Sequence, residues 1–231
     1  MSGPQWREVA GVRVADVGQG GPTAVVLPDQ GEDGLCDADS AGVRTLRSEL
    51  RDRGVSVVTV DAADSWYVRN GPTPEWLRDA LRPALAGPCA LVGIGVGGQA
   101  ALANAYRRGD LWPVAAAVAP AGDLGRWYGR GTSLDDECRD ADDARQAEAH
   151  LFFNPLSRPA SQLVWCDPRD EACSPTALRT VSKVQSSGVR LVADLETEAG
   201  GDRDDYLSRR AAELAGWVCD RLEAEAARFV A

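Results

Sequence analysis

Residues 93–98, which read GIGVGG, decide the fold of this chain. They follow a short apolar run from Cys89 to Val92 and precede a helix-like run from Gln99 to Arg108. A strand that passes through a glycine turn into a helix is typical of two functional motifs. One is the dinucleotide fingerprint G-x-G-x-x-G, and the other is the nucleophile elbow G-x-S-x-G of serine hydrolases. In the elbow interpretation, Gly95 stands where the serine should be.

Strand-like and helix-like segments alternate along the whole chain, which predicts a mostly parallel twisted sheet with helices on both faces. This is a three-layer α/β sandwich of the α/β-hydrolase type, formed by one domain over residues 1–231 and without a large lid domain. Residues 122–159 form the irregular part, expected to overhang the carboxyl edge of the sheet. The predicted strands are Trp6 to Val14, Thr23 to Leu27, Val55 to Val60, Cys89 to Val92, Val114 to Val118, Gln162 to Trp165 and Val189 to Asp194. The predicted helices are Ser40 to Arg53, Pro74 to Leu85, Gln99 to Arg108, Ser174 to Ser186 and Asp204 to Phe229.

Composition excludes several classes of partner. A net charge of -10 argues against nucleic acid and against anionic membranes. The amino terminus has neither a basic nor an apolar leader region, so we expect a cytoplasmic protein. The six cysteines form no C-x-x-C pair, which predicts reduced thiols and no metal site. Abundant alanine and arginine, with Lys183 as the only lysine, indicate a GC-rich bacterial genome.

The dinucleotide interpretation of the glycine turn meets two difficulties. Its fingerprint normally lies on the first strand of the fold, whereas at least two strand–helix units precede Gly93 here. It also requires an acidic residue about 20 residues further on, and Asp123 lies about 30 residues past Gly93. The elbow interpretation needs a positive φ at its central residue, which Gly95 adopts without steric penalty. A tight turn that binds no ligand at all is the third interpretation.

The stretch from Gly93 to Leu102, GIGVGGQAAL, resembles the G-x-S-x-G-G-x-x-A-L elbow of the esterase D-like esterases, a branch of the α/β-hydrolase superfamily. The resemblance extends from about Thr23 to Val218 and implies the α/β-hydrolase fold. Other stretches that resemble the same bacterial branch are residues 65–68, 127–132, 154–156, 166–168 and 194–197.

The resemblance also assigns catalytic positions. The nucleophile and histidine positions depart from the family pattern, which leaves the acid without a histidine to orient. The nucleophile position falls on Gly95, which has no side chain. The acid follows the strand that ends at Trp165, where Asp170 fits best and Asp167 second. The histidine of a G-G-H-like stretch corresponds to Asp202.

The oxyanion loop departs from the family pattern as well. Where the family reads H-G-x-G, residues 28–31 read PDQG, so Pro28 offers no N–H and Asp29 brings a negative charge. Gln30 and Val96 complete the oxyanion positions. The only histidine, His150, is on a predicted helix beside apolar residues, which favours a structural role.

These losses predict a catalytically degenerate esterase-like protein, a pseudoenzyme. It would keep a cleft above Gly95 for a small ester-like ligand or a protein partner, without a cofactor. The predicted rim consists of Trp66, Tyr67, Trp127 and Tyr128, which could equally pack loops onto the core. The alternatives are residual ester hydrolysis by water activated between Asp170 and Asp202, and nucleotide binding through residues 93–98. The sequence leaves the oligomeric state open.

Overall fold

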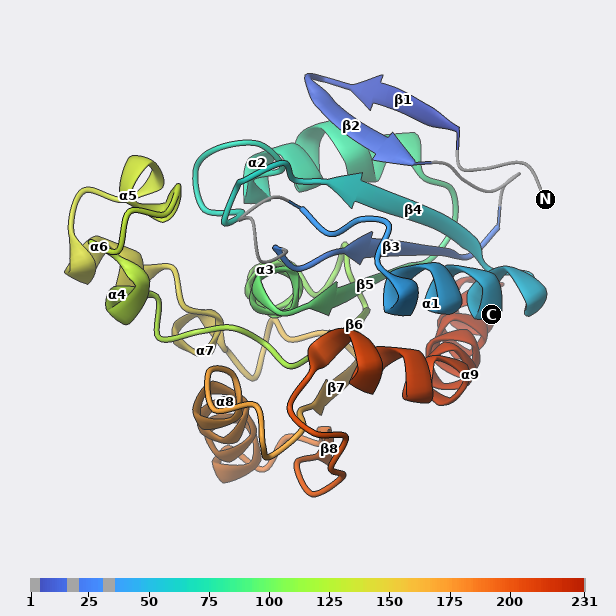
Figure 1. The fold of residues 1–231 in the computed structure, drawn as a ribbon. Coiled ribbons are helices and arrows are strands. Elements are labelled where there is room, and N and C mark those ends of the chain that lie inside the picture. The colour runs from blue at the N-terminus through green and yellow to red at the C-terminus, as the bar shows by residue number, and fades with distance from the viewer. Residues whose placement is uncertain (1–4, 16–20, 31–35, 231) are drawn as a thin grey trace.

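The sheet of the computed structural model has eight strands in the order β1-β2-β4-β3-β5-β6-β7-β8. The structure describes the chain except for residues 1–4, 16–20, 31–35 and 231. β1 and β2 are antiparallel to their neighbours, and all other neighbouring strands are parallel (Figure 1). The strands are β1 (Trp6–Val9), β2 (Val12–Ala15), β3 (Thr23–Leu27), β4 (Ser56–Asp61), β5 (Cys89–Ile94), β6 (Val114–Val118), β7 (Ser161–Trp165) and β8 (Val192–Asp194). The predicted fold class is confirmed.

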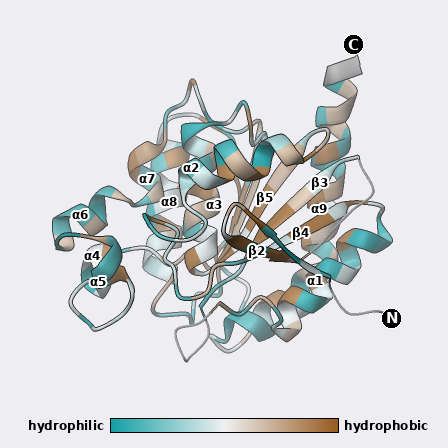
Figure 2. Cartoon of the chain, turned by 90° about the horizontal axis from the view of Figure 1, so that it is seen from above, coloured by the Kyte–Doolittle hydropathy of each residue, from teal (hydrophilic) through white to brown (hydrophobic). Residues whose placement is uncertain are grey.

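The three central strands, β3, β5 and β6, are buried at every position. Their sequences, TAVVL, CALVGI and VAAAV, are apolar on both faces, as expected for parallel strands covered by helices on both sides. Figure 2 shows this apolar centre against outer helices that are partly hydrophilic. Leu27 pairs with Gly93 at the carboxyl ends of β3 and β5, which brings the loops after these two strands together.

The segment predicted as one strand from Trp6 to Val14 is instead a hairpin of β1 and β2. Its two-residue turn consists of Ala10 and Gly11, which have φ values of 45° and 85°. Two consecutive residues with positive φ are what a tight hairpin turn between twisted strands requires. The chain therefore reverses where the β-like pattern seemed to continue.

The helices cover both faces of the sheet (Figures 1 and 2). α1 and α9 pack against each other on one face, and α3 lies on the other with α7 and α8 beside it. The described helices are α1 (Ala41–Asp52), α2 (Pro74–Trp76), the π-helical turn η1 (Leu77–Leu81), the 3₁₀ turn η2 (Arg82–Ala84), α3 (Val96–Arg107), α4 (Leu124–Trp127), α5 (Leu134–Glu137), α6 (Ala141–Gln146), α7 (Ala149–Phe152), α8 (Ser174–Ser186) and α9 (Arg203–Val230). None of them combines the length and apolar character needed to span a bilayer.

One predicted helix, Pro74 to Leu85, is broken into α2, η1 and η2. Pro83 lies within its last turn and has no backbone N–H to donate, so a regular α-helix cannot continue through this position. The irregular segment predicted for residues 122–159 holds four helices, α4 to α7, each of four to six residues. α4, α5 and α6 project beyond the sheet at the left of Figure 1.

Candidate functional site

A sharp turn between β5 and α3 forms the centre of the candidate site. Gly95 occupies this turn with φ 54° and ψ -119°, a conformation that side-chain-bearing residues adopt only under strain. Its N–H donates to the carbonyl of Val118 at 2.9 Å, which fixes the turn against β6. A Cβ at Gly97 would overlap the carbonyl of Leu27, so the helix approaches β3 more closely than any other residue would allow. The turn thus has the geometry of a nucleophile elbow without a nucleophile.

The carboxyl group of Asp29 fills the space beside Gly95. A Cβ placed on Gly95 would overlap all three atoms of this carboxyl group. Its Oδ1 accepts a hydrogen bond from the backbone N–H of Val96 at 2.8 Å. In a hydrolase elbow, the N–H of the residue after the nucleophile stabilises the oxyanion. In this chain a carboxylate already occupies that donor.

Arg203 links Asp29 to Asp170 across the site. Its Nη1 lies 2.5 Å from Oδ2 of Asp29, and its Nε lies 2.7 Å from Oδ2 of Asp170. The Asp170 side chain is 5% exposed and the Asp29 side chain 13% exposed, so both pairs are shielded from water. Burial opposes the charge of Arg203, but the two carboxylates raise the pKa of its guanidinium above the usual value. A row of alternating charges, Asp170–Arg203–Asp29, therefore ends at the elbow.

The two candidate acids after β7 have different contacts. Asp170 faces Arg203 with one oxygen, and its other oxygen accepts the N–H groups of Ala172 and Cys173. Asp167 instead accepts three backbone N–H groups, from Arg169, Ala199 and Gly201, and so attaches the segment before α9 to the end of β7. Burial disfavours its charge, but these donors lower the pKa of Asp167. Of the two acids, Asp170 is the one that contacts Arg203.

Asp202 lies close to the site but not between Asp170 and the elbow. It is exposed, and its side chain accepts the N–H of Asp205 at 2.7 Å in the first turn of α9. The position that the sequence assigned to Asp202 is filled by its neighbour Arg203, because Asp202 is used as a helix cap. Sequence reasoning missed Arg203. The sequence held one indication of Arg203. Asp29 was expected beside the elbow, and a shielded carboxylate there requires a cation nearby.

The other oxyanion positions have structural contacts. Pro28 is buried, and its carbonyl accepts the hydroxyl of Tyr67 at 2.9 Å. The side chain of Gln30 donates to the carbonyls of Asp64 and Ser65 at 2.7 and 3.1 Å. Gly31 lies outside the described residues. The carbonyl of Pro28 and the side-chain amide of Gln30 are therefore both engaged by other parts of the protein.

A cavity of about 390 Å³ opens beside Asp29 and Arg203, at the amino ends of α1 and α9. We call it the Asp29 cavity. Among the described residues that line it, several carry a carboxylate and one, Arg203, carries a cationic side chain. Asp204, in its wall, accepts the N–H of Gly42 at 2.7 Å and so joins α9 to α1. The described residues that line it are Asp29, Gln30, Asp37, Ser40, Val43, Ile94, Gly201, Asp202, Arg203 and Asp204.

The four aromatic residues predicted as a rim do not line the Asp29 cavity. Trp66 and Tyr67 are 5% and 3% exposed and belong to the core. Trp127 packs on Trp66, with ring centroids 5.8 Å apart, and Tyr128 donates its hydroxyl to the carbonyl of Arg139. Here the alternative that these aromatics pack loops onto the core agrees with the contacts.

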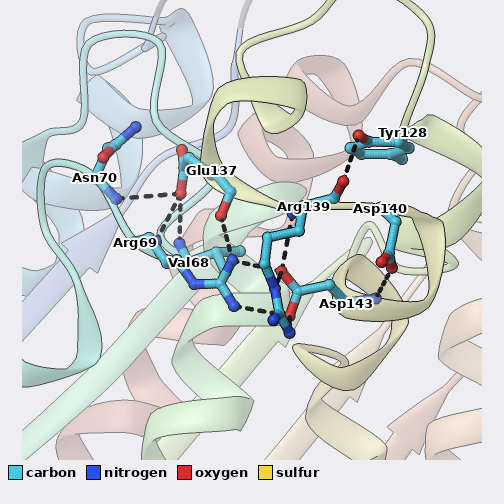
Figure 3. Close-up of polar contacts among 8 residues, drawn as sticks. All are labelled: Val68, Arg69, Asn70, Tyr128, Glu137, Arg139, Asp140 and Asp143. Carbon is cyan, nitrogen blue, oxygen red and sulfur yellow. Dashed lines mark hydrogen bonds and ion pairs between the residues drawn. The ribbon is translucent and has the colours of Figure 1, made fainter.

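One buried carboxylate, that of Glu137, fixes the loop that carries Trp66 and Tyr67. Figure 3 shows it facing the backbone of Val68, Arg69 and Asn70. Its Oε2 accepts these three N–H groups at 2.9, 2.8 and 3.3 Å, and its Oε1 accepts the N–H of Trp66 at 2.6 Å. Sequence reasoning missed Glu137 because it stands in an acidic run, residues 135–137, that resembles a solvated loop.

The remaining candidate base is the only histidine. His150 contacts the buried carboxylate of Glu148 at 3.2 Å, and its pKa is lowered by burial and by the charge of Arg179. The six cysteines are free thiols. In the described ranges, no group of three or more histidine, cysteine or acidic side chains is arranged to hold a metal ion.

Comparisons with known proteins agree on the fold. No protein-family model and no curated protein matches the chain. Among solved structures, it is similar to a ferulic acid esterase, with 12% identity, a TM-score of 0.68, and coverage of 91% of this chain and 92% of that one. It is also similar to an S-formylglutathione hydrolase from Agrobacterium tumefaciens, with 14% identity, a TM-score of 0.65, and coverage of 91% and 89%. The α/β hydrolase domain-containing protein 10 from mouse matches with 13% identity, a TM-score of 0.64, and coverage of 96% and 99%. The chain therefore has the α/β-hydrolase fold, and its structural neighbours include esterases.

Proposed function

We propose that this chain is a catalytically inactive, esterase-like α/β-hydrolase-fold protein that binds a small ligand in the Asp29 cavity. One observation carries the proposal: the carboxyl group of Asp29 occupies the space that the side chain of a nucleophile at residue 95 would need. The same carboxylate accepts the N–H of Val96, which an acyl-transfer reaction would require for its oxyanion.

Each catalytic role then lacks a residue to perform it. Gly95 has no nucleophilic atom. Arg203, held between Asp170 and Asp29, stays protonated at neutral pH and cannot accept a proton as a general base. An oxyanion forming beside Asp29 would meet a like charge. Loss of the triad contribution alone corresponds to about 10⁶ in rate.

The charges of the Asp29 cavity favour a ligand with a cationic end. Asp202 and Asp204 add carboxylates to its wall, whereas the one cation, Arg203, is already engaged by two carboxylates. A volume of about 390 Å³ suits a small molecule. We therefore favour an ester or amide that carries an ammonium group. The ammonium group suits the carboxylates of the cavity, and esters are the substrates of the structural neighbours that are named esterases.

Hydrolysis assays test the catalytic half of the proposal. We expect p-nitrophenyl acetate and p-nitrophenyl butyrate to be hydrolysed at the buffer rate with or without the protein. A serine esterase assayed at the same concentration is the positive control. A protein-dependent rate that saturates with substrate and disappears in Asp29→Ala would overturn the proposal of inactivity.

A matched ligand series tests the binding half. Butyrylcholine, 3,3-dimethylbutyl butyrate and monobutyl succinate are a cationic, a neutral and an anionic ester of similar size. We expect only butyrylcholine to raise the melting temperature, and Asp202→Asn to reduce this shift, because asparagine keeps the helix cap but removes a wall charge. An equal response to all three esters, or none to butyrylcholine, would contradict a cation-binding cavity.

The two alternative functions draw no support from the contacts. Asp170 is paired with Arg203 and Asp202 caps α9, so the two do not share a position for a water molecule. For nucleotide binding, a phosphate at the start of α3 would need the N–H of Val96. That N–H is bonded to the carboxylate of Asp29, which would repel a phosphate.

A further inference from the structure

A second hollow, the α8–α9 groove, lies far from the elbow. It has a volume of about 720 Å³ and is bordered by the start of β7, the segment between α8 and β8, and the second half of α9. Gln162, the second residue of β7, lies in its wall, whereas Asp29 follows the carboxyl end of β3. Because these strands run in the same direction within the sheet, the groove and the Asp29 cavity lie at opposite edges.

Two buried polar atoms in the wall of the groove have no hydrogen-bond partner among the described residues. Gln162 is 3% exposed; its Nε2 donates to the carbonyl of Arg190 at 3.0 Å, but its Oε1 has no donor. Trp217 is partly buried, and its indole Nε1, itself shielded from solvent, has no acceptor among the described residues. Buried polar atoms are nearly always paired in folded proteins. One donor and one acceptor in the same wall therefore point to a ligand that carries both.

The groove is also cationic in an acidic protein. Most described arginines are paired with carboxylates, as Arg210 is with Asp194 and Glu213. Arg190 and Arg221 line the groove, and neither forms an ion pair or a side-chain hydrogen bond in the part of the chain that the structure describes. Leu191 and Val192 supply apolar wall beside them. Two free guanidinium groups next to an indole suit a carboxylate on a flat apolar body.

We propose that the α8–α9 groove binds a small aromatic carboxylate that also carries a hydrogen-bond donor. The carboxylate lies between Arg190 and Arg221, the ring packs beside Trp217 and Leu191, and the donor reaches Oε1 of Gln162. The site is independent of the Asp29 cavity, which selects the opposite charge.

Calorimetric titration with three related compounds tests this site. The compound 4-hydroxyphenylacetate carries both required groups, phenylacetate lacks the donor, and tyramine replaces the carboxylate with an ammonium group. We expect 4-hydroxyphenylacetate to bind most tightly and phenylacetate more weakly. Tyramine has the ammonium group that suits the Asp29 cavity, so any binding of tyramine should be weakened by Asp202→Asn and unchanged by Arg221→Gln. No heat of binding with 4-hydroxyphenylacetate up to about 10 mM, or tyramine binding that Arg221→Gln weakens, would overturn the proposal.

Variants assign the binding to the groove. Arg221→Gln removes one exposed charge without disturbing the core, and we expect it to weaken 4-hydroxyphenylacetate about tenfold. Trp217→Phe keeps a ring but removes the N–H, and a several-fold loss is expected. Arg209→Gln, on another part of α9, is the control and should bind as the unaltered protein does. Unchanged affinity in Arg221→Gln would overturn the site.

A last variant separates this proposal from the proposed function. Asp202→Asn alters the Asp29 cavity only, so it should leave the affinity for 4-hydroxyphenylacetate unchanged. If Asp202→Asn or an excess of butyrylcholine abolishes the binding, the aromatic carboxylate binds in the Asp29 cavity and the groove proposal is wrong.

Discussion

Two carboxylates, the partly buried Asp29 at the carboxyl ends of the central strands and the buried Glu137 in the projecting α4–α6 region, have different contacts in this molecule. Asp29 accepts one backbone N–H and pairs with the guanidinium of Arg203. Glu137 accepts four backbone N–H groups from one loop and has no cation paired with its carboxyl oxygens among the described residues (Figure 3). The first carboxylate fills the space beside Gly95, and the second holds a loop that lacks regular secondary structure.

The comparison separates two ways of burying a negative charge. Around Asp29 the balance is between charges, because Arg203 stands between two carboxylates. Around Glu137 it is between a charge and peptide dipoles. Removing a charged partner should therefore lower the free energy of unfolding most around Asp29. Removing a hydrogen-bond acceptor should lower it most around Glu137.

The largest effect is expected from Arg203→Met. It leaves Asp29 and Asp170 buried without their cation, and we expect the free energy of unfolding to fall by about 3 kcal/mol. Denaturant unfolding measures this. The control is Arg209→Met, which removes an exposed ion pair between Arg209 and Asp205 on the same helix. It should change the free energy of unfolding by less than about 0.5 kcal/mol. Equal stability of the two variants would show that the charge row does not hold the site together.

The next effect concerns the second region. Glu137→Gln keeps the size of the side chain but replaces one acceptor oxygen with a donor, so at least one buried N–H loses its partner. We expect a loss of about 2 kcal/mol and faster hydrogen exchange at the amides of Val68 and Arg69. The control is Asp136→Asn, an exposed neighbour on the same helix α5. Unchanged exchange at those amides in Glu137→Gln would refute the anchoring role.

A third carboxylate, Asp194, combines both kinds of contact and titrates. It is partly buried, which opposes its charge, but bonds from the Thr197 hydroxyl, the N–H groups of Glu196 and Thr197, and Arg210 lower its pKa to about 2. Since its unfolded pKa is near 3.9, its stabilising effect is complete above about pH 4 and is lost as the pH falls toward 2. We expect about 1 kcal/mol of the acid-induced loss of stability to be absent in Asp194→Asn. Urea unfolding at pH 6, 4 and 3 measures this, and parallel pH profiles of the two proteins would contradict it.

The fold could be predicted because its signal is local and repeated. Fully apolar strands and glycine-terminated helices recur along the chain, and Gly54 and Gly188 follow helix ends with positive φ as expected. The hairpin at Ala10 and Gly11 was missed because alanine gives no warning of a positive φ. The break of the helix near Pro83 was missed as well, because it depends on the one backbone N–H that proline lacks.

The sequence predicts where the candidate site lies, but not which side chains meet there. Asp29 lies beside Gly95, and Arg203 links it to Asp170; all three follow or face the carboxyl ends of parallel strands. Arg203 could not be placed because one residue of offset at the start of α9 decides whether Asp202 or Arg203 faces the site. The burial of Trp66 and Tyr67 was not evident from the sequence, since Glu137, which holds their loop, lies about 70 residues away along the chain.

The most direct test of the central claim is the stability cycle formed by Gly95→Ser and Asp29→Ala. If the Asp29 carboxyl group fills the space of a side chain at residue 95, serine should be costly with Asp29 present and cheaper without it. We expect a coupling free energy of about 1 kcal/mol or more from denaturant unfolding of the four proteins. An equal cost of Gly95→Ser in both backgrounds would contradict the account.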